Sequence, residues 1–266
     1  MDDRQIIATF RTLALEAGDL IMEVYGREDF EVAAKSDASP VTEADEAADA
    51  HISAGLRAAF PDMVLVTEEQ AGTHSIEAKT FIIVDPLDGT KEFIQRRGDF
   101  TVNIALVRDG VPDLGVVYAP AKERLFYTDG AGGAVEETGP FDKDTPGAAK
   151  SIAVSPSPNN AGLRVVASKS HRDAATDAYI SKYATSDAKS AGSSLKFCLV
   201  ATGEADLYPR LGRTMEWDTA AGDAVLRAAG GVMVRFEDHV TFDYGKSGFA
   251  NGFFIAAAPG VDLKPA

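Results

Sequence analysis

The segment 81–90, FIIVDPLDGT, constrains the fold of this chain more than any other stretch. Its apolar run from Phe81 to Val84, followed by proline and by Asp-Gly, predicts a buried strand that ends at a loop. Asp85 and Asp88 then lie where a strand end meets a helix start, which is the usual place for a ligand site in an α/β protein. Two carboxylates beside a turn whose backbone N–H groups can bind an anion favour a divalent cation with oxygen ligands, such as Mg²⁺.

The same segment also allows simpler interpretations. Asp85 would then merely end the strand, and Asp88 would merely cap the helix that follows. The D-x-D-G-T loop of haloacid-dehalogenase-type phosphatases is similar too, but it has one residue between its aspartates, whereas this chain has two. The segment alone does not decide between these interpretations, and the choice depends on motifs in the remainder of the chain.

The overall charge limits the partners of this chain. Its 266 residues contain 26 Lys and Arg against 41 Asp and Glu, which gives a net charge of −15 at pH 7. Such a surface repels nucleic-acid polymers and anionic membranes, although a small anionic substrate can bind where metal ions reverse the field locally. The single cysteine, Cys198, excludes an internal disulfide and fits a reducing cytoplasm. Neither a signal peptide nor a stretch of transmembrane length is evident, so we expect a cytoplasmic protein without an integral membrane segment.

Helices laid on an antiparallel sheet are predicted for the first half of the chain, residues 1–137. Apolar residues recur at helical spacing over residues 3–25, and a second helix runs from Thr42 to about Phe60. Apolar runs then predict strands, two of which are joined by a turn at Asp109-Gly110. The expected strands are 64–66, 81–84, 101–107, 114–118, 124–127 and 134–135.

The segment 138–150 is rich in proline, glycine and charge, and is the expected boundary to a second half, residues 138–266. There the pattern alternates between strands and helices, so the predicted fold class is α/β, with an α+β first half and an α/β second half. The expected strands are 152–154, 163–167, 206–208, 232–234 and 253–256, and the expected helices are 173–183, 195–202 and 218–229.

Further acidic residues follow the ends of other predicted elements. Glu68 lies in the TEE segment (67–69) at the end of a short strand, and a neighbouring strand would bring it near Asp85 and Asp88. Glutamates at a strand end are usually solvated turn charges, but three carboxylates at one edge repel one another, and a divalent cation relieves that repulsion. Thr42 and Asp45 have the spacing of a capping box, and this spacing alone favours a plain helix-start role for Asp45.

Motifs spread along nearly the whole chain suggest a family. They are VTEAD (41–45), TEE (67–69), VDPLDGTKEF (84–93) and EWDTAAGDAVLRAAGG (216–231). On these motifs the chain resembles the inositol-monophosphatase superfamily of Mg²⁺-dependent, lithium-sensitive phosphomonoesterases. Other stretches are similar to the bacterial 3'(2'),5'-bisphosphate nucleotidases of that superfamily, namely SKSH (168–171), GSSLKFC (192–198) and LYPR (207–210). The resemblance implies a layered αβαβα sugar-phosphatase fold.

The resemblance also implies roles for the matching residues. Two or three Mg²⁺ ions would be held by carboxylates and one backbone carbonyl, those of Glu68, Asp85, Leu87, Asp88 and Asp218. Asp45 and Thr90 would orient the attacking water, and the backbone amides of Gly89 and Thr90 would bind the scissile phosphate. Asp218 would reach the site from the second half, although it would equally serve as the N-cap of the helix that follows it.

Contacts to a second phosphate and a nucleoside are expected from the second half. Lys196 and Arg210 are the expected phosphate ligands, with Ser193 and His171 near the nucleoside. Lys196 would otherwise be a solvated helix lysine, and His171 an ordinary exposed loop histidine.

The activity that the resemblance implies is hydrolysis of adenosine 3',5'-bisphosphate, and of its 2'- and 3'-phosphate relatives, to AMP and phosphate in sulfur metabolism. One alternative is an inositol monophosphatase or a fructose-bisphosphatase-like sugar phosphatase of the same superfamily. Another is a non-catalytic metal- or nucleotide-binding protein, against which the presence of both Asp45 and Thr90 counts. The sequence leaves open whether the protein is a monomer or a homodimer.

Overall fold

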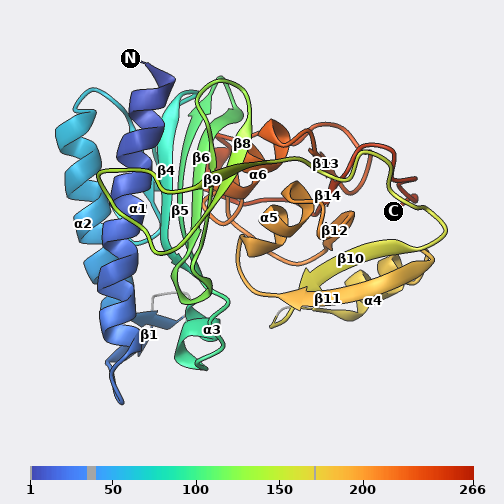
Figure 1. Ribbon diagram of the computed structural model, residues 1–266, viewed down its shortest axis with the longest axis horizontal. Helices are drawn as coiled ribbons and strands as arrows, with labels where there is room; N and C mark the ends of the chain where they lie inside the picture. The colour runs from blue at the N-terminus through green and yellow to red at the C-terminus, as the bar shows by residue number, and fades with distance from the viewer. Residues whose placement is uncertain (1, 35–39, 171) are drawn as a thin grey trace.

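The computed structural model describes residues 2–34, 40–170 and 172–266, and these residues form five layers (Figure 1). Two long helices cover one face of a seven-stranded sheet, called the first sheet below. Two shorter helices separate it from a five-stranded second sheet, and a further helix covers the outer face of the second sheet. The αβαβα arrangement implied by the family resemblance is confirmed.

The first sheet is built from strands that follow one another along the chain. Its order is β3-β4-β5-β6-β7-β8-β9, in which β3 and β4 run parallel and the later neighbours are antiparallel. Both β4 and β5 lie inside the sheet and are buried along almost their whole length, as their continuous apolar runs predict. In chain order the strands span Leu65–Thr67, Phe81–Asp88, Thr101–Arg108, Val111–Ala119, Arg124–Thr128, Ala134–Thr138 and Ala149–Ile152.

The outer face of the first sheet is covered by α1 (Asp3–Tyr25) and α2 (Glu43–Ala59). Each helix presents an apolar stripe to the sheet, and burial of one large apolar side chain contributes about 1.5–3 kcal/mol to stability. Between the helices, β1 (Val32–Ala34) and β2 (Pro40–Thr42) form an antiparallel ribbon. Because β2 leads directly into α2, it places Asp45 in the first turn of that helix.

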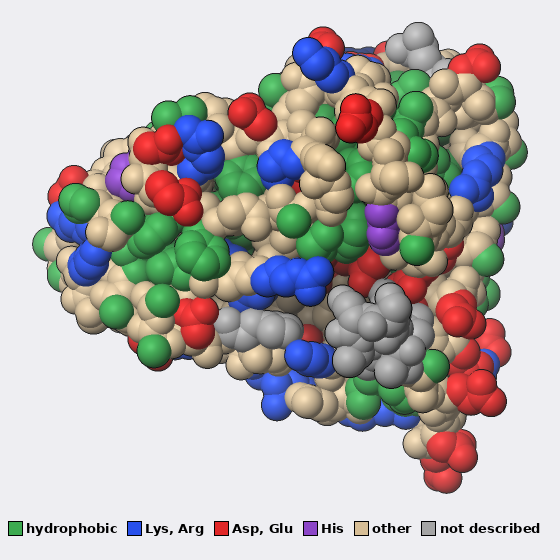
Figure 2. Space-filling view, turned by 180° about the vertical axis from the view of Figure 1, so that it is seen from behind, with side chains coloured by type: hydrophobic (Ala, Val, Ile, Leu, Met, Phe, Trp, Pro, Cys, Tyr) green, Lys and Arg blue, Asp and Glu red, His purple; other side chains and the backbone are tan. Residues whose placement is uncertain are grey.

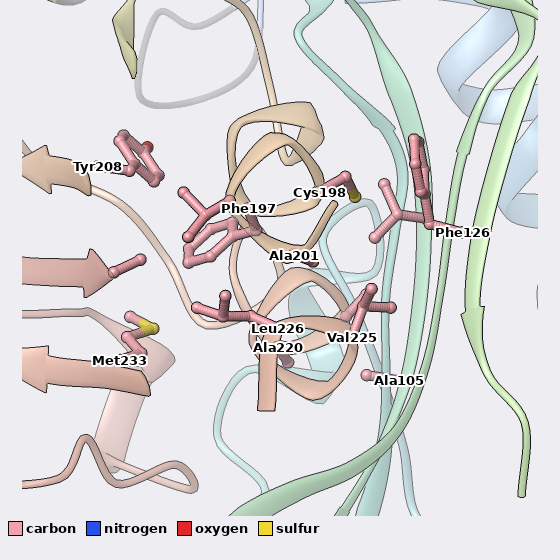
Figure 3. Packing of buried hydrophobic residues seen from close by; sticks show 14 of the residues in the cluster. Ala105, Phe126, Phe197, Cys198, Ala201, Tyr208, Ala220, Val225, Leu226 and Met233 are labelled. Carbon is pink, nitrogen blue, oxygen red and sulfur yellow. The ribbon is translucent and has the colours of Figure 1, made fainter. Parts of the chain in front are cut away.

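The central layer consists of α5 (Leu195–Ala201) and α6 (Ala220–Ala228), which are buried between the sheets. Figure 3 shows Cys198 of α5 on the side of Phe126, in the first sheet, and Phe197 on the side of the second sheet. Burial raises the pKa of the Cys198 thiol, so this cysteine is part of the apolar core and no nucleophile.

The second sheet has the order β11-β10-β12-β14-β13. Here β10 runs parallel to β11 and β12, whereas β14 is antiparallel to both of its neighbours. The outer face is covered by α4 (Ala174–Ile180), whose Tyr179 is almost fully buried. From β10 to β14 the strands span Leu163–Ser168, Thr185–Ala191, Leu207–Arg210, Val232–Arg235 and Phe254–Ala257.

Short helices complete the described chain. The helix α3 (Thr90–Ile94) starts directly after Gly89, whose φ of +96° lies in the left-handed region. A Cβ atom at that position would lie 3.1 Å from the carbonyl oxygen of Asp99, so conformation and space both favour glycine there. Three 3₁₀ helices in the described residues cover Ala71–Thr73, Pro120–Lys122 and Ser247–Phe249.

The structure corrects several predicted elements of the second half. Instead of the strand at 152–154 there is β9, which ends at Ile152 and pairs with β8, so the first sheet continues beyond residue 137. The helix predicted over 173–183 is the shorter α4, and it is followed by β11, which the sequence analysis missed. The residues of β11, TSDAKSA, are mostly polar and exposed, because an edge strand contacts water along its outer side and lacks the apolar pattern of an interior strand.

Candidate active site

Two neighbouring strands end at the same edge of the first sheet and bring acidic residues together. Thr67 of β3 pairs with Val84 of β4, and the backbone N–H of Glu68 donates to the carbonyl of Val84 (3.1 Å). Since these strands are parallel, Glu68 and Asp85 follow them at the same edge, as the sequence predicts. Each contributes a carboxylate oxygen to a group that also includes Asp218, with the three oxygens within 4.8 Å of one another. This set of three residues is called the acidic group below.

Asp218 reaches the acidic group from the other half of the chain. It lies in a turn before α6, where its backbone N–H donates to the Met215 carbonyl (3.2 Å) and the Met215 N–H donates to its Oδ2 (2.8 Å). Its own carbonyl accepts a hydrogen bond from the Ser194 hydroxyl (2.6 Å). The N-cap of α6 is Thr219, so the alternative role of Asp218 as the N-cap of that helix is wrong.

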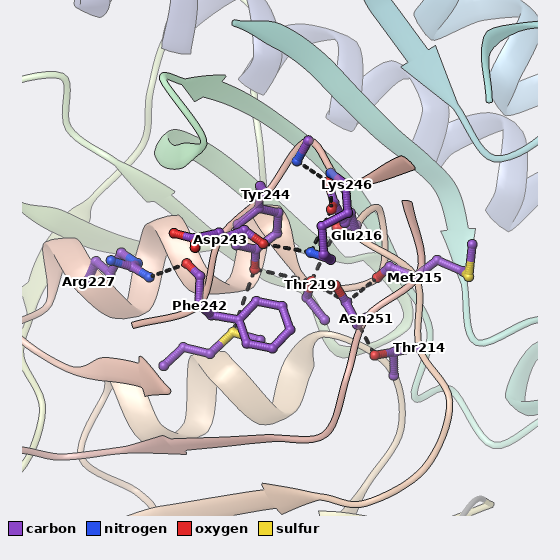
Figure 4. A network of polar contacts seen from close by, with 12 residues as sticks. Thr214, Met215, Glu216, Thr219, Arg227, Phe242, Asp243, Tyr244, Lys246 and Asn251 are labelled. Carbon is purple, nitrogen blue, oxygen red and sulfur yellow. Dashed lines mark hydrogen bonds and ion pairs between the residues drawn. The ribbon is translucent and has the colours of Figure 1, made fainter. Parts of the chain in front are cut away.

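A polar network holds this turn in place (Figure 4). Glu216, which is fully buried, accepts hydrogen bonds from the backbone N–H (3.0 Å) and the ammonium group (2.6 Å) of Lys246. Asn251 donates to the carbonyl of Met215 (2.8 Å). The turn is thus fixed by residues 246–251 through contacts that do not involve the acidic group.

Asp88 lies beside the acidic group and has other partners. Its Oδ2 accepts a hydrogen bond from the backbone N–H of Ser194 (2.6 Å) and a longer one from Nδ2 of Asn103 (3.4 Å). Ser194 therefore contacts Asp88 through its N–H and Asp218 through its hydroxyl. The start of α5 thereby links the aspartates of the two halves.

Crowding and burial change how readily these carboxyl groups ionise. Burial raises the pKa of Asp88 to about 6, although the nearby Lys196 opposes this shift and Glu68 adds to it. Burial, with Asp88 and Glu68 as neighbours, also raises the pKa of Asp218 well above its usual value. A divalent cation would stabilise the ionised form of all these groups, so this set of oxygen donors fits a hard metal ion.

The backbone between Asp85 and Asp88 leaves the regular ladder of the sheet. The register of β4 against β5 shifts between these two residues, and the N–H of Leu87 donates to Oδ1 of Asp85 (3.1 Å). The carbonyl oxygen of Leu87 lies 3.4 Å from the Thr90 hydroxyl. This carbonyl is therefore at the same strand end as the acidic group.

Asp45 and Thr90 are in direct contact. The Thr90 hydroxyl donates to Oδ1 of Asp45 (3.1 Å). The other oxygen, Oδ2, accepts hydrogen bonds from the backbone N–H (2.8 Å) and the hydroxyl (2.5 Å) of Thr42, the N-cap of α2. The capping box is thus present with Asp in its last position, and the carboxylate that completes it is the one that contacts Thr90.

A cavity of about 710 Å³ opens at the acidic group, a size typical of ligand pockets. Figure 2 shows acidic side chains gathered in a recess of this face, with basic and histidine side chains close to them. Asp85, 1% exposed, is buried next to this cavity and does not line it. The predicted site residues that line it are Glu68, Asp88, Gly89, Thr90, Ser193, Lys196, Arg210 and Asp218.

Lys196 is a buried cation on the cavity wall. It is 4% exposed, its Nζ donates to the carbonyl of Ser193 (2.5 Å), and it lies 5.4 Å from the ring centroid of Tyr208. Burial lowers the pKa of Lys196 to about 8, with Asp88 opposing that shift. The alternative interpretation of Lys196 as a solvated helix lysine is wrong.

Of the other residues that were predicted to contact the nucleotide, the structure describes Arg210 and Ser193. Arg210 is 8% exposed and donates to the carbonyl of Arg213 (3.2 Å). Ser193 has a φ of +46°, and among the described residues its buried hydroxyl has no hydrogen-bond partner, which suits a group that binds a ligand. His171 lies outside the described residues.

Sequence reasoning missed some residues that line the cavity. Glu92 is 2% exposed and accepts a hydrogen bond from the Ser170 hydroxyl. A glutamate in the first turn of a short helix gives no signal in the sequence that separates a cavity wall from a solvated surface. His74 and Trp217 also line the cavity. The tryptophan lies within the EWD motif, but no role was predicted for it.

The chain belongs to the inositol monophosphatase family, whose family model matches residues 2–258. Within that family it is similar to the 3'(2'),5'-bisphosphate nucleotidase CysQ of Salmonella typhimurium, with 47% identity over 221 residues, or 82% of this chain and 85% of the relative. The enzyme of the same name from Escherichia coli K12 has the same identity and coverage. That of Buchnera aphidicola is 40% identical over 233 residues, or 86% of this chain and 83% of the relative.

Solved structures agree with the fold. The crystal structure of CysQ from Bacteroides thetaiotaomicron is similar with a TM-score of 0.82 and 36% identity, covering 96% of this chain and 97% of the other. The inositol monophosphatase from Anabaena has a TM-score of 0.74 at 24% identity, covering 98% of this chain and 93% of the other, and it supports the fold alone.

The family is metal-dependent, and the acidic group could hold a metal ion. In the part of the chain that the structure describes, no helix combines the length and the apolar composition needed to cross a membrane.

Proposed function

We propose that this protein is a Mg²⁺-dependent phosphomonoesterase that hydrolyses adenosine 3',5'-bisphosphate, and its 2'- and 3'-phosphate relatives, to AMP and phosphate. The observation that carries this proposal is that Glu68 and Asp218 of the acidic group line one cavity together with two buried cations, Lys196 and Arg210. Relatives that are 40–47% identical over more than four fifths of the chain are named 3'(2'),5'-bisphosphate nucleotidases, which supports the substrate class.

Metal binding is assigned to oxygen atoms of both halves. Glu68, Asp85 and Asp218 would hold Mg²⁺ through their carboxylates, with Asp88 and the Leu87 carbonyl as further ligands to two or three ions. No histidine or cysteine belongs to this predicted ligand set, which favours Mg²⁺ over zinc. Bound Mg²⁺ would stabilise the negative charge that develops on the phosphoryl oxygens and the leaving oxygen.

The chain's own residues would position the water and transfer its proton. Because the Thr90 hydroxyl donates to Asp45, the Thr90 oxygen can accept a hydrogen bond from a water molecule. As this water attacks the phosphorus, its proton passes to Thr90 and the Thr90 proton passes to Asp45. The bond between phosphorus and the sugar oxygen breaks, the leaving oxygen takes up a proton from solvent, and Asp45 returns its proton to solvent. The backbone amides of Gly89 and Thr90 would hold the phosphoryl group during this step.

The two buried cations favour a substrate with a second phosphate. The chain has a net charge of −15, so an anion with two phosphates needs local positive charge in order to enter. Lys196 and Arg210 supply that charge, and Ser193 has a hydroxyl available to accept or donate a hydrogen bond. A phosphate ester without the second phosphate would lack this attraction to Lys196 and Arg210. We place His171 near the nucleoside on the resemblance alone.

A substrate panel tests the proposal. Phosphate release with Mg²⁺ should be much faster from adenosine 3',5'-bisphosphate than from inositol 1-phosphate or fructose 1,6-bisphosphate. Equal or faster turnover of either sugar phosphate would replace the nucleotidase assignment by that of a sugar phosphatase. Absence of turnover on the whole panel, together with Mg²⁺ binding, would identify a non-catalytic metal-binding protein.

A further inference from the structure

A stacked pair of rings joins the two segments that carry Glu68 and Asp218. The imidazole of His74 and the indole of Trp217 have centroids 4.7 Å apart and planes inclined by 29°. His74 ends the 3₁₀ turn that follows Glu68, and Trp217 directly precedes Asp218. The stack is therefore a side-chain contact between the first half and the second, next to the acidic group.

Both rings are held by contacts outside the acidic group. The Nε2 atom of His74 lies 2.8 Å from the carbonyl oxygen of Thr67, and because a carbonyl only accepts, Nε2 carries a proton that it donates. The imidazole is thereby tied to the last residue of β3, directly before Glu68. Trp217 is 6% exposed and lies against Phe249, with ring centroids 6.3 Å apart.

The acidic group needs such support because its members repel one another. Glu68 and Asp218 come from separate segments, and their carboxylate oxygens lie within 4.8 Å. Like charges at that distance favour separation of the two segments unless other contacts oppose it. A metal site whose ligands are already in position binds its ion without having to reorganise first.

We propose that the His74–Trp217 stack is a positioning contact that holds Glu68 and Asp218 at the separation required for binding a divalent cation. The inference rests on the proposed function and extends it to two residues outside the acidic group. His74 is accordingly a positioning residue, and its loss should weaken Mg²⁺ affinity while leaving the chemistry at saturating Mg²⁺ almost unchanged.

Mg²⁺ binding measured by calorimetry on the full-length protein tests this inference. In His74→Ala, which removes both the ring and the hydrogen bond, affinity should fall about 5- to 100-fold, the loss expected from one aromatic contact and one hydrogen bond together. His74→Phe keeps a ring on Trp217 and should retain most of the affinity. The matched control is His51→Ala, since His51 is a partly exposed residue of α2 paired with Glu16. It should bind Mg²⁺ like the wild type.

Fluorescence gives a second readout, because Trp217 is the single tryptophan of the chain. Its emission should change on addition of Mg²⁺ in the wild type and in His74→Phe, with midpoints that match calorimetry. In steady-state kinetics, His74→Ala should raise the Mg²⁺ concentration for half-maximal rate by the same factor and change kcat by less than about twofold.

Distinct results separate failure of this inference from failure of the proposed function. Wild-type affinity in His74→Ala would overturn the positioning role and leave the proposed function intact. Equal losses in His74→Phe and His74→Ala would assign the effect to the hydrogen bond and overturn the role of the stack. A wild-type protein that does not bind Mg²⁺ would overturn the metal site and, with it, this inference.

Discussion

The contact between Thr90 and Asp45 is the smallest unit of the site with a chemical role. The Thr90 hydroxyl donates to Oδ1 of Asp45, while Oδ2 is held by Thr42 at the start of α2. Rotation of the carboxylate is therefore restricted by backbone capping, which keeps Oδ1 directed at Thr90. A residue that sequence spacing identifies as a helix-start acid is, in the fold, also a partner of the predicted water-orienting threonine.

Removal of the Thr90 hydroxyl should lower the rate and spare binding. We expect kcat of Thr90→Ala to fall by about 10²–10⁴-fold, the range for loss of a proton-transfer partner. The Mg²⁺ affinity should stay close to that of the wild type, because the Thr90 hydroxyl is not part of the acidic group. Steady-state kinetics and calorimetry measure the two quantities. Thr90→Ser, which keeps the hydroxyl, is the control, and a similar loss of rate in both variants would show that the hydroxyl is not responsible.

Lys196 should determine the preference for the second phosphate. Replacing it by methionine keeps the apolar stem and removes the charge from a side chain that is 4% exposed. We expect KM for adenosine 3',5'-bisphosphate to rise about 10–100-fold, as for a lost charge-assisted hydrogen bond, and KM for adenosine 3'-monophosphate to change little.

The comparison of two substrates is needed because Lys196 also affects the ionisation of Asp88. An effect through Asp88 would alter both substrates equally, and that result would argue against a contact with the second phosphate. Lys189→Met is the control for removal of one positive charge, because Lys189 is 39% exposed on the edge strand β11.

At the scale of elements, a buried ion pair connects α1 to the first sheet. Arg11 of α1 and Glu137 of β8 are 3% and 0% exposed, and the guanidinium contacts the carboxylate at 2.6 Å. Glu137 also accepts hydrogen bonds from the Tyr127 hydroxyl (3.1 Å) and the backbone N–H of Gly147 (2.8 Å). The pair therefore joins a helix, two strands and the loop before β9.

Breaking this pair should destabilise the fold strongly. Arg11→Met leaves Glu137 buried without its cation, and such a loss costs about 3–5 kcal/mol in the free energy of unfolding. Urea denaturation measures it. The partly exposed pair between Arg108 and Asp3 is the control, since Arg108→Met should cost no more than about 1 kcal/mol. Similar values for both variants would contradict this assignment.

The same pair should contribute to the dependence of stability on pH. Burial raises the pKa of Glu137, but the hydrogen bonds from Arg11 and Gly147 outweigh it, and the net pKa lies below the usual 4.5. A lowered pKa in the folded state gives stability that is present above the unfolded value and is lost as pH falls through the folded value. The difference in unfolding free energy between wild type and Arg11→Met should therefore shrink below about pH 4.5. A constant difference down to pH 3 would contradict this.

The elements differ in how far the sequence predicts them, and the reason is physical. The interior strand β4 is recognised from FIIV because a strand buried on both faces has to be apolar throughout. In β11 the edge position removes that requirement, and its TSDAKSA sequence resembles a loop. Glu68 and Asp85 could be placed together from neighbouring strand ends alone. Asp218 required the family resemblance, since no local pattern tells which distant turn folds onto that edge.

At the scale of the whole molecule, the two halves of the chain meet at carboxyl groups whose ionisation depends on pH. Asp218 is presented by a turn of the second half, while Glu68 and Asp85 belong to the first. Burial raises the pKa of Asp88 to about 6 and that of Asp218 above its usual value. A raised pKa in the folded state gives stability that is fully present below the unfolded value, 3.8, and is lost as pH rises through the folded value.

The metal-free protein should therefore lose part of its stability between about pH 4 and pH 7, and Mg²⁺ should restore it. Because the ion binds the ionised carboxylates, its stabilising effect should be small at pH 5 and should approach about 2.7 kcal/mol at pH 7.5 when Mg²⁺ is at 100 times its Kd. Urea denaturation in EDTA and in Mg²⁺ at both pH values measures this difference. In Asp88→Asn the charge is gone at every pH, so the loss of stability in EDTA should be smaller and Mg²⁺ should restore less. An equal Mg²⁺ effect at pH 5 and pH 7.5 in the wild type would show that these carboxyl groups ionise normally in the fold. Repulsion between them would then not be what the cation relieves.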